Sequence, residues 1–150
     1  ADRHPFWNDY ATVYANSLVE GEKANFSHFE KMFFESEKSP GRRLSACACR
    51  SALFIMLYRG YPMLQLPFQL LNNLLEIDEQ LSTWRYRHMN MVTRMIGIRT
   101  GTGGSSGRDY LKGALDKHYI FREIAALSSC LIERRRLPHL SRELEESLGF

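Results

Sequence analysis

The sequence predicts an all-α protein, a helical bundle built around one long helix, and three observations support this. Apolar residues recur at helical spacing along most of the chain, and no stretch sustains the alternation of apolar and polar residues that marks a strand. The sequence contains no further Pro and no Gly from Pro67 up to Gly97, a stretch of about 30 residues. With 150 residues, 44% of them hydrophobic, the chain has the size and composition of one globular domain.

The first helices are short and are separated by turn signals. Apolar residues follow helical spacing over 6–18 and again over 26–33, and Gly21 between them is expected to bend or end a helix. Ser39-Pro40-Gly41 reads as a turn. A helix from about Leu44 to Arg59 follows, and its apolar run Leu53–Leu57 predicts burial nearly all round. We expect Gly60 to act as its C-terminal cap and Pro62 to prevent its continuation.

The next predicted helix runs from Pro67 to about Ile98, roughly 45 Å at the standard rise. One stripe of this helix is expected to be buried, and it reads Leu71, Leu74, Leu75, Asp78, Leu81, Trp84, His88, Met91, Val92 and Met95. After the glycine-rich segment 101–107, a further amphipathic helix should continue to Pro138, and a short charged helix should lie within 141–150.

Composition and charge exclude some classes of protein. The net charge of +3 is mild, and basic clusters as short as Arg134-Arg135-Arg136 do not require nucleic acid. No apolar run approaches the roughly 20 residues of a membrane span. Three cysteines without CxxC spacing are expected to be reduced thiols of a cytoplasmic protein. The chain begins without methionine, which suggests a processed or truncated product.

His88 is the residue in the long helix most suited to chemistry. It lies four residues after Trp84 and four before Val92, so all three share one face. A lone histidine on an apolar stripe is more often a hydrogen-bonded core residue than a ligand. Haem ligation is the functional alternative, because one neutral imidazole can be the only protein ligand to haem iron. A zinc site is disfavoured, since no second His, Cys or carboxylate lies three or four residues after His88.

The segment Gly101-Thr102-Gly103-Gly104-Ser105-Ser106-Gly107 also has two interpretations. Glycines let backbone amides approach a ligand closely, but the same composition is typical of a flexible linker. It is neither a Rossmann fingerprint nor a P-loop, because no strand precedes it and Gly-Lys-Ser/Thr is absent. A segment at this distance after His88 can fold back over whatever that histidine binds.

Together these motifs resemble a known family. Trp84-Arg85-Tyr86-Arg87-His88 and the glycine segment 101–107, with Arg42-Arg43-Leu44-Ser45 and Pro67-Phe68-Gln69-Leu70-Leu71 upstream, closely resemble the signature of the tryptophan 2,3-dioxygenases. The resemblance covers about residues 40–140, and its two central motifs are highly specific. It implies an all-α fold of the tryptophan/indoleamine dioxygenase type, whose long helix bears haem.

The resemblance also implies roles for individual residues. His88 would be the proximal ligand of haem b (iron protoporphyrin IX), and Trp84 would lie beside it. Met91, Val92 and Met95 would line the proximal haem face, and Tyr110 would lie close to the haem edge. Thr102 would contact the amino-acid end of the substrate, while Gly103 and Gly104 would let the chain close around it. No other residue of this chain is implied to be catalytic.

The implied reaction inserts both atoms of O2 across the indole C2–C3 bond of L-tryptophan to give N-formylkynurenine, a step of the kynurenine pathway. The family's distal-histidine motif and carboxylate-binding arginine are absent here, and residues 1–38 read as a connecting helical region. We therefore expect residues 1–150 to be the carboxy-terminal half of a haem dioxygenase that needs an amino-terminal half, on the same precursor or a second chain. The family is typically tetrameric. Three alternatives stay open: a short paralogue in place of a fragment, a related haem enzyme that hydroxylates an aromatic amino acid, and a non-catalytic helical partner module.

Overall fold

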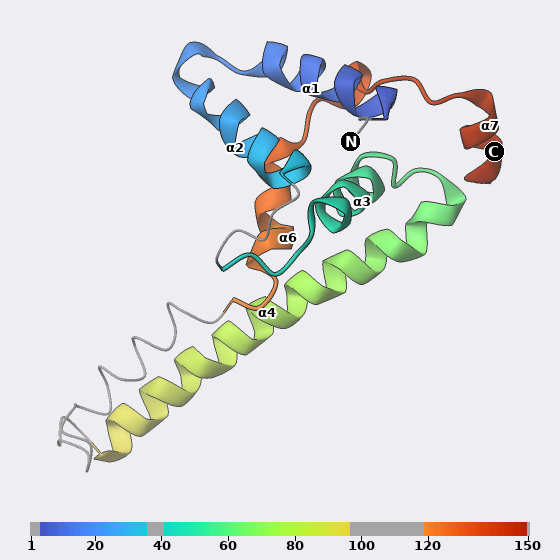
Figure 1. The fold of residues 1–150 in the computed structure, drawn as a ribbon. Coiled ribbons are helices and arrows are strands. Elements are labelled where there is room, and N and C mark those ends of the chain that lie inside the picture. Colours follow the sequence, from blue (N-terminus) through green and yellow to red (C-terminus); the bar gives the residue numbers. More distant parts are fainter. Residues whose placement is uncertain (1–3, 36–40, 97–118, 150) are drawn as a thin grey trace. The chain divides into compact units, whose positions relative to one another are not determined.

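The computed structural model describes residues 4–35, 41–96 and 119–149, and the elements in these ranges are all helical. The predicted all-α class is therefore confirmed for the part of the chain that is described. The elements, drawn in Figure 1, are α1 (Pro5–Ser17), η1 (Glu20–Glu22), α2 (Ala24–Phe34), α3 (Ala46–Leu57), α4 (Pro62–Ile96), α6 (Arg122–Ala126), η2 (Leu127–Cys130), η3 (Arg134–Arg136) and α7 (Arg142–Ser147).

The chain divides into two compact units. The first consists of Ala1–Leu71 together with Glu123–Phe150, and the second is Asn72–Arg122. The boundary at residue 71 falls inside α4, which runs without a break from one unit into the other. None of the helices in the described ranges is long and apolar enough to cross a membrane.

Side-chain caps start α1, α3 and α7 in the first unit. Pro5 occupies the first turn of α1, and the His4 Nδ1 accepts the Phe6 N–H at 3.3 Å. The Ser45 hydroxyl accepts the Ala48 N–H at the start of α3, and the Ser141 hydroxyl does the same for Leu144 in α7. Between α1 and α2 the chain forms the short turn η1 at Gly21, as the sequence predicts.

Aromatic rings make the core of the first unit. Tyr10 and Tyr14 of α1 pack on Phe29 and Phe33 of α2, and Leu53 of α3 is fully buried beside them. The rings of Tyr14 and Phe29 stack with centroids 4.7 Å apart, and those of Phe29 and Phe33 lie at 4.8 Å. Such pairs stabilise a core beyond the apolar area that they bury. The amino-terminal 35 residues thus supply much of this core.

The carboxy-terminal segment is not the continuous helix that the sequence predicts up to Pro138. The α-helix ends at Ala126, and the chain continues as the 3-10 turns η2 and η3. The hydroxyls of Ser128 and Ser129 donate to the carbonyls of Ala125 and Ala126, each at 2.7 Å. These local bonds compete with helix propagation, which explains why the prediction is wrong here.

Tyrosine hydroxyls hold this irregular segment to the helices. The Tyr10 hydroxyl donates to the Cys130 carbonyl at 2.6 Å, and that of Tyr14 donates to the Ser129 carbonyl at 3.3 Å. The Tyr58 hydroxyl donates to the Pro138 carbonyl at 2.6 Å. Buried carbonyls released from helical pairing therefore regain partners from α1 and from the end of α3.

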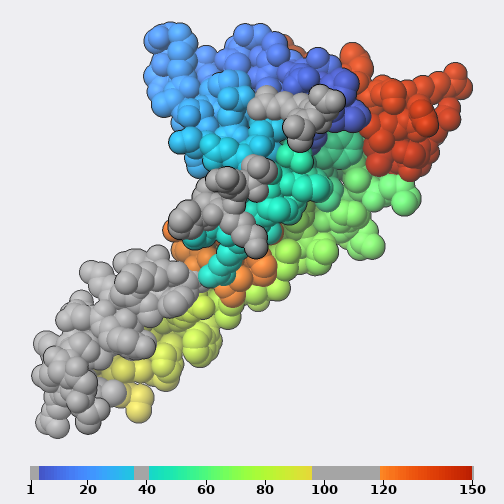
Figure 2. All heavy atoms as spheres, viewed as in Figure 1, coloured from blue at the N-terminus to red at the C-terminus, as the bar shows by residue number. Residues whose placement is uncertain are grey.

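Helix α4 begins at Pro62, five residues before the predicted start at Pro67. Pro62 suits a first helical turn as well as Pro67 does. The Met63 N–H, which has no partner within the helix, donates to the Leu148 carbonyl at 3.1 Å. Figure 2 shows the red carboxy-terminal segment lying against the green start of α4. This long-range contact decides the helix start, and local sequence does not reveal it.

Helix α3 agrees with the prediction in place but differs in its end and its burial. Its C-cap is Tyr58, whose N–H donates to the Phe54 carbonyl at 3.0 Å, and Gly60 has no positive φ. A Cβ atom at Gly60 would lie 2.9 Å from the end of the flexible Arg134 side chain, which can move aside. Only Leu53 of the run Leu53–Leu57 is fully buried. The expected burial all round is therefore wrong for the described part of the chain.

We expect Tyr10→Phe to lower the free energy of unfolding by about 1 to 3 kcal/mol, because the buried Cys130 carbonyl would lose its partner. Urea denaturation followed by circular dichroism would measure the change. Tyr119→Phe, at an exposed tyrosine, is the matched control. Equal stability of the two variants would contradict the assigned role of the hydroxyl.

A second expectation concerns alkaline pH. Burial, followed by the neighbouring Cys130, raises the pKa of Tyr14 from 10.0 to about 12. The unfolded chain therefore loses this proton first, so the stabilisation is complete below pH 10 and declines as pH rises toward 12. In wild type the free energy of unfolding should fall between pH 9 and pH 11.5. Denaturation series at these two pH values should show that Tyr14→Phe reduces this fall by about 1 to 2 kcal/mol. Parallel declines in both proteins would contradict the role of Tyr14.

Candidate functional site

The predicted ligand His88 and its neighbour Trp84 lie in the second unit, on the long helix α4. Spacing of four residues places both side chains on one face. Their rings stack with centroids 5.2 Å apart and an interplanar angle of 12°. The indole thus forms a flat wall beside the imidazole and restricts its rotation.

The surroundings of His88 are apolar but accessible. Trp84 is 61% exposed, Met91 50% and Met95 77%, while His88 and Val92 are partly buried. The expected burial of this stripe is therefore wrong at these positions. The described residues of the second unit, 72–96 and 119–122, contain no complete helix other than α4 that could cover the face of His88. Exposed apolar side chains around a histidine are the arrangement that a flat apolar ligand would fill.

The His88 imidazole makes no hydrogen bond to any other residue in the described ranges. Among the described residues, then, no partner holds His88 as a core histidine bonded through both nitrogens would be held. The same ranges contain no group of three or more His, Cys, Asp or Glu side chains that could hold a metal ion. The described part of the chain thus offers one imidazole that no described residue binds, and a single imidazole is all that haem iron requires from a protein.

Asp78 lies on the stripe predicted for α4, but the sequence did not indicate what its carboxylate binds. Its side chain is buried, with 4% exposed. One carboxylate oxygen accepts the Ile120 N–H at 2.9 Å, and the other accepts the Phe121 N–H at 2.6 Å. The signal available in the sequence was a carboxylate within an otherwise apolar stripe, since a buried charge needs partners. The backbone amides that Asp78 binds lie 42 and 43 residues further along the chain, so the sequence did not identify them.

Glu123 does the same in the first unit. Its two oxygens accept the N–H groups of Arg43 and Leu44, each at 2.7 Å. These amides directly precede Ser45, the N-cap of α3, so Glu123 binds the chain immediately before that helix. Bonds from amides to a carboxylate are stronger than those to neutral acceptors. The Arg42-Arg43-Leu44-Ser45 motif is therefore held through its backbone.

The remaining predicted residues lie outside the described ranges. They are Thr102, Gly103, Gly104 and Tyr110. A hollow of about 590 Å³ lies along α4 beside Trp84, and among described residues its other walls are polar or charged. Trp84 belongs both to this hollow and to the apolar face described above, whereas His88 is not among the described residues that line the hollow.

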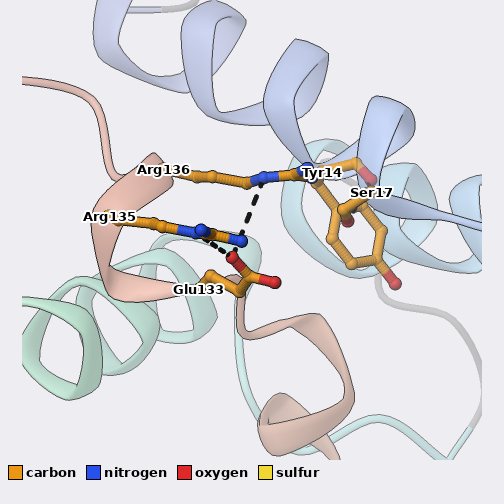
Figure 3. Close-up of polar contacts among 5 residues, drawn as sticks. All are labelled: Tyr14, Ser17, Glu133, Arg135 and Arg136. Carbon is orange, nitrogen blue, oxygen red and sulfur yellow. Dashed lines mark hydrogen bonds and ion pairs between the residues drawn. The ribbon is translucent and has the colours of Figure 1, made fainter.

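A second hollow, of about 310 Å³, lies in the first unit between α1 and the segment 129–136. Figure 3 shows Tyr14 and Ser17 of α1 facing Arg136, while Arg135 and Arg136 both approach Glu133. The hydrogen bond from Arg135, 2.5 Å long, lowers the pKa of the Glu133 carboxyl. The basic run 134–136 is thus partly neutralised by its own acidic neighbour. All three cysteines are free thiols, with Cys47 exposed and Cys49 and Cys130 buried.

Comparison with known proteins agrees with the motifs. The family model described as tryptophan 2,3-dioxygenase matches residues 8–131. Among relatives with that name, the one from Alteromonas mediterranea is 43% identical over 133 residues, covering 85% of this chain and 37% of its own length. That from Bdellovibrio bacteriovorus is 40% identical and covers 97% of this chain and 44% of its own length. That from Dictyostelium discoideum is 38% identical, covering 95% and 37%.

The chain therefore spans about two fifths of the length of these relatives. The family match includes residues 8–38, which precede the motifs that carried the resemblance.

We expect the two tryptophans to differ in accessibility when the chain is studied alone. Trp7 packs against Phe6 and Phe33, whereas Trp84 is largely exposed. The emission of a Trp7→Phe variant, which reports Trp84, should lie at longer wavelength and be quenched more strongly by acrylamide than that of Trp84→Phe. The reverse order would show that the His88 face is covered.

Proposed function

Because this chain belongs to the tryptophan 2,3-dioxygenase family, we propose that it forms the haem-bearing part of an enzyme that converts L-tryptophan and O2 to N-formylkynurenine. The names of the relatives support this reaction, a step of tryptophan catabolism in the kynurenine pathway. Our proposal includes the cofactor haem b, whose iron His88 would hold through its imidazole.

The stacked pair of Trp84 and His88 on an apolar, exposed face is the observation that carries the proposal. An iron porphyrin needs one neutral imidazole with a free nitrogen and apolar contacts over its face. His88 has no hydrogen-bonding competitor among the described residues, and Trp84 limits its ring to one plane. Met91, Val92 and Met95 supply flexible and branched apolar side chains around it. The described residues therefore fit the group.

When bound, haem supplies the redox chemistry of dioxygen, and the protein supplies position and environment. His88 would hold the iron from one side, and its stacking on Trp84 would keep the ligating nitrogen aimed in one direction. The apolar side chains would exclude water from that side. From the family motif we assign Thr102 to the amino-acid end of the substrate, Gly103 and Gly104 to close approach of the backbone, and Tyr110 to the cofactor edge.

A partner segment belongs to the same proposal. Large apolar side chains are exposed along α4, both in the first unit at Met63, Leu66 and Leu70 and in the second at Ile77, Trp84, Met91 and Met95. Exposed apolar area of this extent marks surfaces that another protein segment or a ligand covers. We assign the covering segment to the amino-terminal half of the enzyme, which would also supply the distal side of the pocket. A cytoplasmic homotetramer completes the proposed assembly.

The test uses the chain together with an amino-terminal half from a relative, loaded with haem. We expect a Soret band and formation of N-formylkynurenine in wild type and in the control His139→Ala, which changes an exposed histidine. His88→Ala should lose the ferrous spectrum of an imidazole-ligated haem. Its activity should fall by more than about 100-fold, because loss of mere outer-shell partners of a metal ligand costs about 10- to 100-fold.

An unchanged ferrous spectrum in His88→Ala would show that the ligand assignment is wrong. A wild-type assembly that binds haem but forms no N-formylkynurenine would overturn the reaction while leaving the cofactor assignment in place. An assembly without any Soret band would refute both.

A further inference from the structure

An apolar hollow of about 370 Å³ lies in the first unit, where the start of α1 meets α3 and α7. Its walls are mostly large apolar side chains, namely Phe6 and Trp7 of α1, Phe54 and Ile55 of α3 and Leu144 of α7. All five are partly buried, so the chain leaves part of their apolar surface uncovered. Concave apolar sites with a few polar groups are the usual form of small-molecule sites, and this volume suits a ligand of one or two rings.

Packing holds the aromatic rings of these walls in defined orientations. Phe6 lies edge to face with Trp7, with ring centroids 4.9 Å apart, and with Phe54 at 5.5 Å. Trp7 stacks in turn on the fully buried Phe33 at 6.3 Å. Rings that are already ordered lose little freedom when another ring packs on them, and aromatic pairs are favourable beyond the area that they bury. The walls therefore favour an aromatic ligand over an aliphatic one.

Arg50 of α3 gives the hollow a positive charge. Its guanidinium donates one hydrogen bond, to the Phe33 carbonyl, and lies 5.8 Å from the centroid of the Phe34 ring. The ion pairs of the described residues do not include Arg50, and none of the described residues that line the hollow is acidic. A guanidinium has five N–H donors and can bind both oxygens of a carboxylate. The hollow is thus complementary to an apolar molecule with one negative charge.

We propose that this hollow binds a small aromatic carboxylate, with its ring against Phe6, Trp7 and Phe54 and its carboxylate at Arg50. The inference is independent of the proposed function, because the hollow belongs to the first unit and none of its residues is assigned to haem or to tryptophan. Arg50 is only partly buried, so solvent weakens its attraction for the carboxylate. We therefore expect a Kd on the order of 1 mM for a ligand with a single ring.

The test uses the full chain with the substitution Trp84→Phe, which leaves Trp7 as the remaining tryptophan. The probe is 3-phenylpropionate. Its neutral counterpart 3-phenylpropanamide keeps the ring without the charge, and propionate keeps the charge without the ring. Binding is followed by the emission of Trp7 and, separately, by the rate at which iodoacetamide alkylates Cys47, an exposed cysteine in the wall of the hollow.

We expect 3-phenylpropionate to change the emission of Trp7 in a saturable way and to slow the alkylation of Cys47 over the same range of concentrations. The amide should bind about tenfold more weakly, because it lacks the charge-assisted hydrogen bonds to Arg50. Propionate should also bind at least about tenfold more weakly, because it lacks the buried apolar area of the ring.

Ser51, an exposed residue in the same wall, allows the charge of the hollow to be changed without altering Arg50 or the core. Ser51→Glu should weaken the binding of 3-phenylpropionate about three- to tenfold by repulsion, and Ser51→Lys should strengthen it about two- to threefold. Neither should alter the binding of the amide. Ser27→Glu, the same substitution at an exposed position of α2 outside the hollow, is the matched control and should match the parent protein.

Equal affinity for the carboxylate and the amide would overturn the proposal, as would equal effects of Ser51→Glu and Ser27→Glu. Absence of saturable binding up to about 20 mM would also overturn it. A change in Trp7 emission without protection of Cys47 would place the ligand elsewhere and have the same consequence. None of these measurements involves haem or N-formylkynurenine, so this proposal and the proposed function can fail separately.

Discussion

Buried backbone groups that leave helical pairing must find other partners, and the irregular parts of this chain depend on side chains that supply them. Three tyrosine hydroxyls satisfy carbonyls of the segment 129–138 in the first unit. Two carboxylates satisfy pairs of consecutive amides, Glu123 in the first unit and Asp78 in the second. In each case a side chain on a helix, or at its end, binds main-chain groups that lie outside the α-helices.

This arrangement explains why α4 can be both a scaffold and a site. A helix of 35 residues satisfies its own backbone, so its side chains are free for other tasks. Asp78 uses that freedom to hold the main chain at residues 120–121. Ten residues further on, His88 and Trp84 present stacked rings on an apolar face. One helix thus carries both the proposed ligand and the carboxylate that binds the amides of residues 120–121, which favours reproducible geometry between them.

The apolar surface of α4 and the short span of the chain relative to its relatives support one interpretation. A folded protein that stood alone would not be expected to expose Leu66, Leu70, Trp84 and Met95 along one helix. The relatives named tryptophan 2,3-dioxygenase are more than twice as long as the matched region. An additional segment and a haem group together would bury these side chains, and this is why we treat the activity as a property of the assembly.

Sequence by itself determined the helical class, the places of α1, α2, α3 and α7, and the pairing of Trp84 with His88, because periodicity and capping residues act over a few positions. It also determined the family, because the motifs around His88 and in 101–107 are specific. It was wrong about the start of α4, the end of α3 and the helix after Ala126. The start of α4 and the course of the chain after Ala126 involve contacts of Leu148 with Met63 and of Tyr10 and Tyr14 with the segment 129–130, which join residues more than 80 positions apart. Only the tertiary structure could show that Asp78 and Glu123 bind backbone amides, since a carboxylate's partner is decided by which chain segment the fold brings to it.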